Sequence, residues 1–139
     1  MNEAKRTTTI LAKVRTRWPS AWVWKVNDRI TSGIPDAEIV IAGRTFRIEF
    51  KLLPSTTALI EREITEIQKM TMRALRSAHA HVAVVGVLPT GAERIYEPQL
   101  IDRDLRFPSH PALSLVAYLE SELTCSQLPS ATVTSGSAT

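Results

Sequence analysis

The sequence predicts an α/β protein in which helices flank a mixed central sheet, with elements in the order α-β-β-β-α-β. Three observations lead to this prediction. Residues 3–17 carry apolar side chains at helical spacing, residues 36–51 alternate between apolar and polar side chains around an Ala-Gly pair, and residues 81–88 form an apolar run. A helix, a two-stranded hairpin and a buried strand account for these patterns.

The first half of the chain is predicted to supply one helix and three strands. The helix covers residues 3–17, and Pro19 ends it because proline cannot continue a helix. Residues 21–26 are rich in Trp and Val and are expected to form a short strand, followed by a polar loop over residues 27–33. The other two strands belong to the hairpin.

The second half is predicted to add a long helix, a strand and a less regular extension. Residues 54–57 supply helix-capping hydroxyls, and the helix that follows is expected to run to about Ala78 with Ile60, Ile64 and Ile67 on its apolar stripe. Three further elements are expected: a strand at residues 81–88, a strand at 94–97 and a helix at 112–123.

Length and composition bound the kind of protein. The 139 residues suit one domain, expected over residues 1–125, with a disordered tail over residues 126–139, which lack periodicity and are rich in Ser and Thr. The composition, 44% apolar and 22% charged, excludes a fibrous or fully disordered protein. A single cysteine, Cys125, excludes an internal disulfide or a Cys-rich zinc site.

No segment of the sequence is expected to enter a membrane. The longest apolar stretch, residues 82–88, is too short to span a bilayer, and the N-terminus lacks the apolar core of a signal peptide. We therefore expect a cytoplasmic protein.

Positive charge is concentrated in the first part of the chain. The net charge is +3, but residues 1–51 contain ten Lys and Arg against five Asp and Glu. A solvated helix face would explain this excess, and so would a surface that binds a polyanion such as DNA. Composition leaves both interpretations open.

The hairpin has a register that its turn determines. If Ala42 and Gly43 form a two-residue loop, Glu38 faces Arg47 and Asp36 faces Glu49. One face is then wholly apolar and consists of Ala37, Ile39, Ile41, Phe46, Ile48 and Phe50. The opposite face consists of Asp36, Glu38, Val40, Thr45, Arg47, Glu49 and Lys51. A slip of one residue would place charges in the core, so this register is strongly favoured.

This register places two carboxylates side by side. Asp36 and Glu49 would have Cβ atoms about 5 Å apart, where like charges repel, and Lys51 projects from the same face. Such a pair suits a hard divalent cation such as Mg²⁺, to which the backbone carbonyl of Phe50 could add a ligand. The alternative is an exposed strand end at which Asp36 and Lys51 form an ordinary surface ion pair.

The motif resembles that of a nuclease superfamily. Pro35-Asp36, followed after a hairpin by Glu49-Phe50-Lys51, is similar to the signature of the PD-(D/E)xK nucleases. The start Gly33-Ile34-Pro35-Asp36, and Gln68 in the next helix, are most similar to the VRR-NUC and phage Holliday-junction-resolvase-like branches. The resemblance covers about residues 3–88 and implies the restriction-endonuclease-like αβββαβ core.

The resemblance also implies roles for individual residues. Asp36 and Glu49 would hold one or two Mg²⁺ ions, with Mn²⁺ able to substitute, and Lys51 would stabilise charge on the phosphate. Gln68 becomes a candidate for positioning water or phosphate, whereas the sequence alone favours an edge residue bonded to backbone. A glutamate from the first helix often reaches the metal in this superfamily, which makes Glu3 a further candidate ligand.

Residues before the motif are candidates for DNA contacts. Lys25, Arg29 and Ser32 could bind phosphates, or they could be solvated loop residues. Trp22 and Trp24 could stack on bases, but their strand-like alternation favours packing in a core or a dimer.

Taken with the resemblance, these features imply a metal-dependent endonuclease that hydrolyses phosphodiester bonds in DNA. No helix-turn-helix or finger pattern is present, so recognition of branched DNA is expected, with Holliday junctions in DNA recombination as the specific case. A homodimer would match the symmetry of a junction. Two alternatives are a non-catalytic DNA-binding or assembly subunit that keeps the nuclease fold, and an interaction protein in which the charged trio is structural.

Overall fold

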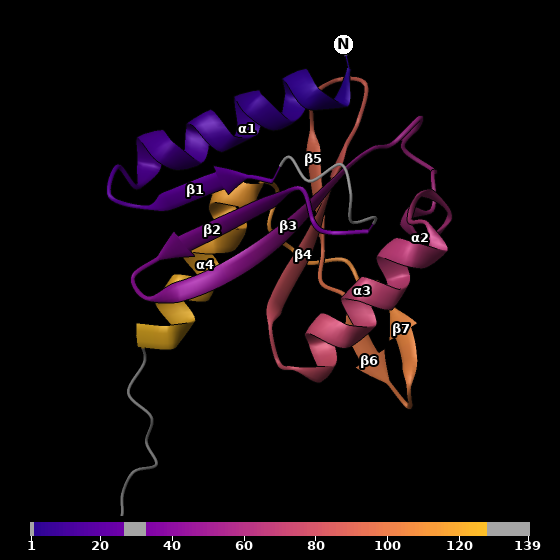
Figure 1. Ribbon diagram of the computed structural model, residues 1–139. Coiled ribbons are helices and arrows are strands. Elements are labelled where there is room, and N and C mark those ends of the chain that lie inside the picture. Colours follow the sequence, from indigo (N-terminus) through magenta and orange to yellow (C-terminus); the bar gives the residue numbers. More distant parts are fainter. Residues whose placement is uncertain (1, 27–32, 128–139) are drawn as a thin grey trace, which may run out of the picture.

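The computed structural model describes residues 2–26 and 33–127 (Figure 1). Its elements are α1 (Glu3–Arg17), β1 (Trp22–Lys25), β2 (Ala37–Ile41), β3 (Arg44–Leu52), α2 (Ile60–Glu63), α3 (Glu66–Ser77), β4 (His81–Val87), β5 (Glu93–Tyr96), β6 (Gln99–Ile101), β7 (Asp104–Arg106) and α4 (Leu115–Gln127). Within these ranges no helix is long and apolar enough to cross a membrane.

Five strands form a mixed sheet in the order β1-β2-β3-β4-β5. β3 and β4 are parallel, and the other neighbouring pairs are antiparallel. The α/β class, the mixed sheet and its flanking helices are therefore confirmed. A separate two-stranded hairpin, β6–β7, was not predicted, because three-residue strands are too short to show an alternation.

The register of the β2–β3 hairpin is confirmed. Glu38 pairs with Arg47, and Ile41 pairs with Arg44 across the turn. Ala42 and Gly43 both have positive φ, 51° and 81°, as the two-residue turns that match the twist of a hairpin require.

The sheet lies between two layers. Helices α1 and α4 cover one face, and α2, α3 and the β6–β7 hairpin lie on the other (Figure 1). All six apolar residues of the hairpin face are buried against α1 and α4. Strand β4 is buried on both faces, because Val85 belongs to the core under α1 and α4, whereas Val82 and Val84 belong to the core on the α3 side.

The predicted long helix after residue 57 is wrong in one respect. The segment forms two helices, α2 and α3, that are separated at Ile64 and Thr65. Thr65 is extended (φ −72°, ψ 161°) and caps α3 with its side chain, so it starts a new helix instead of continuing the first. Ile60 and Ile64 are buried as expected, but Ile67 is half exposed and does not belong to the buried stripe.

Two further expectations require correction or stay open. α4 begins at Leu115 and includes residues 126 and 127, which were expected in the tail, and residues 128–139 lie outside the described residues. Trp22 and Trp24 are 60% and 50% exposed on the edge strand β1, so their predicted packing in the core is wrong. Packing in a dimer stays a prediction, as do the limits of the domain.

Candidate active site

The site forms where β2 begins and β3 continues beyond it. The last residue pair between β2 and β3 is Ala37 with Ile48. Phe50 and Leu52 lie beyond this pair, so β2 offers no carbonyl oxygen to their N–H groups. Asp36 Oδ2 accepts a hydrogen bond of 2.8 Å from the Phe50 N–H, and Glu3 Oε2 accepts one of 3.4 Å from the Leu52 N–H. Two carboxylates thus occupy the positions at which a neighbouring strand would offer carbonyl oxygens.

Glu49 is the most constrained residue of the site. Its side chain is 2% exposed, and its Oε1 accepts a hydrogen bond of 3.1 Å from Nε2 of Gln68. Its Oε2 is buried and receives no hydrogen bond within the described part of the chain. The Asp36 carboxyl lies within hydrogen-bonding reach of the Glu49 carboxyl, so the two acids face each other as the register predicted.

The electrostatics of the site reflect this burial. Burial raises the pKa of Glu49 to about 9, the Asp36 carboxylate contributes to the rise, and the Lys51 charge opposes it. Burial also raises the pKa of Glu3, again with Asp36 adding to the shift and Lys51 opposing it. Lys51 therefore lies close enough to Glu3 and Glu49 for its charge to act on both.

These observations test whether a divalent cation fits. Burial beside the Asp36 carboxyl makes ionisation of Glu49 costly, and a divalent cation would offset that cost by taking the place of the proton. The Phe50 carbonyl points to the same edge of β3 as the Phe50 N–H, which is bonded to Asp36. The donor set therefore consists of oxygens, as Mg²⁺ and Mn²⁺ prefer, and its use as a metal site stays a proposal.

Gln68 combines both interpretations that the sequence left open. Its backbone N–H donates to Thr65 Oγ1 at 3.2 Å, and its Oε1 accepts from the Thr65 N–H at 3.0 Å. This capping box fixes the amide so that Nε2 points to Glu49. Thr65 and Gln68, three residues apart, carry the sequence signature of this capping box, which marks the start of α3.

The remaining predicted DNA contacts are tested only in part. Lys25 lies in β1, pairs with Ala37 and is half buried. Arg29 and Ser32 lie outside the described residues. A role of these residues in phosphate binding stays a prediction.

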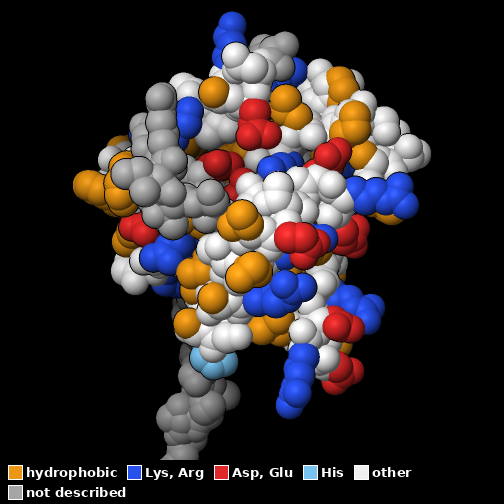
Figure 2. All heavy atoms as spheres, turned by 45° about the vertical axis from the view of Figure 1, so that its right-hand side comes forward, with side chains coloured by type: hydrophobic (Ala, Val, Ile, Leu, Met, Phe, Trp, Pro, Cys, Tyr) orange, Lys and Arg blue, Asp and Glu red, His pale blue; other side chains and the backbone are white. Residues whose placement is uncertain are grey.

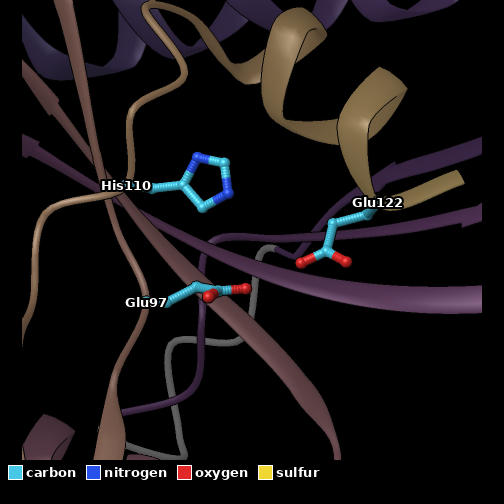
Figure 3. Close-up of side chains that lie close together, drawn as sticks. All are labelled: Glu97, His110 and Glu122. Atoms are coloured by element: carbon cyan, nitrogen blue, oxygen red, sulfur yellow. The ribbon is translucent and has the colours of Figure 1, made fainter. Parts of the chain in front are cut away.

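A second cluster of possible metal ligands lies elsewhere. Glu97, His110 and Glu122 point toward one another, and their ligand atoms all lie within 4.8 Å (Figure 3). No sequence pattern indicates this cluster, because its members are scattered along the chain and belong to no motif.

Hydrogen bonds and the charge of Arg44 already satisfy the polar groups of this second cluster. His110 Nδ1 accepts a hydrogen bond of 3.0 Å from the Ala112 N–H, so a neutral ring carries its proton on Nε2, where a metal would need a lone pair. The Tyr118 hydroxyl donates to Glu97 at 2.9 Å, and Arg44 Nη2 lies 3.9 Å from Glu122. Burial and the hydrogen bond to Glu97 raise the pKa of Glu122. We interpret the cluster as a hydrogen-bond network that fastens α4.

Replacing Tyr118 with Phe should test this interpretation. The substitution keeps the edge-to-face contacts of the ring with Phe46 and His110 and removes the donor to Glu97. We expect a loss of about 1 kcal/mol in the free energy of unfolding, measured by urea denaturation. An unchanged free energy of unfolding would contradict a structural role for this hydrogen bond.

No family model matches the sequence, and no curated protein is similar to it. Among solved structures, the chain is similar to Hjc, a Holliday junction resolvase from the archaeal hyperthermophile Archaeoglobus fulgidus. The TM-score is 0.48 at 17% sequence identity, over 81% of this chain and 92% of that chain. A similarity of this degree assigns neither a family nor an activity to the chain, and membership of the VRR-NUC branch stays a prediction.

Proposed function

We propose that the protein is a metal-dependent endonuclease of the PD-(D/E)xK type that hydrolyses phosphodiester bonds in DNA. The observation that carries the proposal is the state of Glu49: it is buried, it is held at one oxygen by Gln68, and its other oxygen has no donor among the described residues. Asp36 lies within hydrogen-bonding reach of the Glu49 carboxyl, and Lys51 and Glu3 lie near enough to influence its pKa.

Asp36, Glu49 and the Phe50 carbonyl are the proposed ligands of Mg²⁺, with Mn²⁺ able to replace it, and Glu3 is a further candidate. Bound there, the ion would polarise the scissile phosphate and lower the pKa of a bound water. The protein positions these ligands before the ion binds, through the Phe50 N–H on Asp36 and the Gln68 amide on Glu49. Pre-positioned ligands avoid an ordering cost when the substrate binds.

Lys51 and the basic N-terminal region have electrostatic roles in this proposal. Lys51 lies on the same strand as Glu49, two residues further on, so both side chains project from the same face of the sheet. Its charge would therefore lie close to a scissile phosphate at the metal site. It would stabilise the negative charge that develops on the phosphate oxygens. The Lys and Arg residues that precede the motif, Lys25, Arg29 and the basic residues of α1 among them, would bind the sugar-phosphate backbone.

The preferred substrate in this proposal is branched DNA, including the Holliday junction, and the active form is a homodimer. The described residues include no helix-turn-helix or finger motif that would read a sequence in the major groove. Recognition of DNA shape through its phosphates requires no such element. A two-fold dimer would present two sites to two equivalent strands of a junction.

The test is incubation of the purified protein with branched, nicked and linear DNA, in Mg²⁺ and in a chelator. We expect cleavage of the branched DNA only when Mg²⁺ is present. Asp36→Asn, purified in parallel, controls for contaminating nucleases and should be inactive. Cleavage in the chelator would reject the proposed site, and binding of every DNA by the wild type without cleavage would favour the non-catalytic subunit.

A further inference from the structure

A pocket opens beside the candidate active site, on the α3 side of the sheet, next to the part of β1 and β2 that α3 leaves uncovered. Its volume is about 580 Å³, and it lies between the β1–β2 end of the sheet and α3. Its walls include Trp24, Ile34, Pro35, Glu38, Arg47 and Thr71. Pro35 forms part of the wall, and the next residue is Asp36, so the pocket adjoins the proposed metal ligands.

One face of α3 serves both the active site and this pocket. Gln68 reaches Glu49, and Thr71 and Leu75, three and seven residues further on, line the pocket. Figure 2 brings the α3 side of the molecule forward and shows hydrophobic side chains exposed there, and Ile67 and Met70 are among the exposed apolar residues of this helix. The pocket and the proposed metal ligands therefore lie next to each other along α3.

The walls of the pocket suit a flat aromatic ligand. Trp24 is 50% exposed and contributes its indole, and Ile34 and Pro35 add apolar surface. An indole with an exposed face is a surface on which a nucleobase can stack, whichever base it is.

The polar groups of the pocket argue for a base over a purely apolar occupant. Arg47 Nε and Nη2 lie 3.3 and 3.2 Å from Oε2 of Glu38. Both residues line the pocket, so a carboxylate and a guanidinium lie side by side in its wall. An acceptor beside a donor complements the edge of a nucleobase, which also presents donors and acceptors side by side.

We propose that this pocket receives an unstacked base of the DNA substrate and thereby holds the strand next to the scissile phosphate. This inference rests on the proposed nuclease function. Branched DNA supplies unpaired bases at its branch point, where the cost of moving a base out of the stack is smallest. The pocket would thus contribute to the preference for branched over linear DNA.

The test measures binding without divalent ions, so that no cleavage occurs. Two duplexes are compared by fluorescence anisotropy: one carries a single extrahelical 2-aminopurine, and the other carries an abasic nucleotide at that position. We expect the wild type to bind the first about tenfold more tightly and to quench its fluorescence, as stacking on one aromatic side chain predicts. Trp24→Ala should abolish both the preference and the quenching.

Trp22→Ala is the matched control. Trp22 lies on the same strand and the same face as Trp24 and is 60% exposed, but it does not line the pocket. This variant should keep the preference and the quenching. Thr71→Phe, which narrows the pocket from the α3 side, should lose both without any change in Trp24.

Each outcome decides between occupants. If the Trp24→Ala variant still prefers the 2-aminopurine duplex, or if it loses the same affinity for both duplexes, the proposed base pocket is overturned. Trp24→Ala that converts a dimer to a monomer in sedimentation makes a second copy the occupant and overturns it as well. Equal binding of both duplexes by the wild type rejects the pocket but not the nuclease, whereas no DNA binding at all rejects both.

Discussion

Lys51→Met should lower the rate of DNA cleavage by about a hundred- to a thousandfold and leave the response to Mg²⁺ intact. Removal of one group that stabilises developing negative charge typically costs this much in kcat. Lys51 acts on Glu3 and Glu49 through its charge, so its loss makes the carboxylates more attractive to a cation, not less. The measurements are single-turnover cleavage and the rise in melting temperature with added Mg²⁺.

Two variants make this result interpretable. Lys69→Met removes a lysine of α3 that pairs with Glu66, and this variant should cleave at the wild-type rate. Asp36→Asn removes a proposed ligand and should lose both cleavage and the response to Mg²⁺. Cleavage by the Lys51→Met variant at the wild-type rate would exclude the proposed role of Lys51. Loss of the Mg²⁺ response in this variant would make Lys51 part of the metal-binding structure instead.

Without divalent ions, the free energy of unfolding should fall as the pH rises from about 4.5 to about 9. The pKa of Glu49 is 4.5 in the unfolded chain and about 9 in the folded protein, so over this range the folded protein keeps a proton that the unfolded chain has released. The contribution of Glu49 to the free energy of unfolding is fully present below pH 4.5. About 3 kcal/mol of it is lost by pH 7, because each pH unit above 4.5 costs about 1.4 kcal/mol.

Glu49→Gln isolates this contribution. A glutamine has the shape of the protonated acid and can still accept the hydrogen bond from Gln68. At pH 7, without metal, this variant should be more stable than the wild type by about 3 kcal/mol and should not respond to Mg²⁺. Asp36→Asn should also match or exceed the metal-free wild type in melting temperature, because it removes the repulsion from the other side.

Urea denaturation at several pH values checks this prediction, with Glu66→Gln as the control. Glu66 is an exposed acid at the start of α3, and its replacement should leave the pH dependence unchanged. The raised pKa values of Glu3 and Glu122 and the lowered pKa of His81 add pH dependences of their own, so the informative quantity is the difference between the wild type and Glu49→Gln. Parallel curves for these two proteins would contradict a buried, protonated Glu49.

The parts of the fold predicted from sequence are those that local patterns determine. α1 has the predicted bounds, and the β2–β3 register follows from a two-residue turn and one apolar face. From that register alone, Asp36 and Glu49 were expected to face each other, and their carboxyls do so.

The parts that were missed depend on contacts between distant residues. Alternation shows that Trp22 and Trp24 share a face, but not that α3 packs on β4 and leaves this face uncovered. In the same way, helical periodicity continues through Thr65, although its side chain caps a new helix there. The bond between Glu3 and Leu52 requires α1 to lie across the end of β3, which no pattern within α1 reveals.

The hydrogen bonds from Phe50 and Leu52 to Asp36 and Glu3 have a consequence for how this site can change over time. Main-chain N–H groups are present whatever side chain a position carries, proline excepted. The backbone of β3 therefore orients the carboxylates of Asp36 and Glu3, whatever side chains the positions along β3 carry. Most surrounding side chains can be exchanged without displacing them, so such a site can persist while the sequence around it diverges beyond detection.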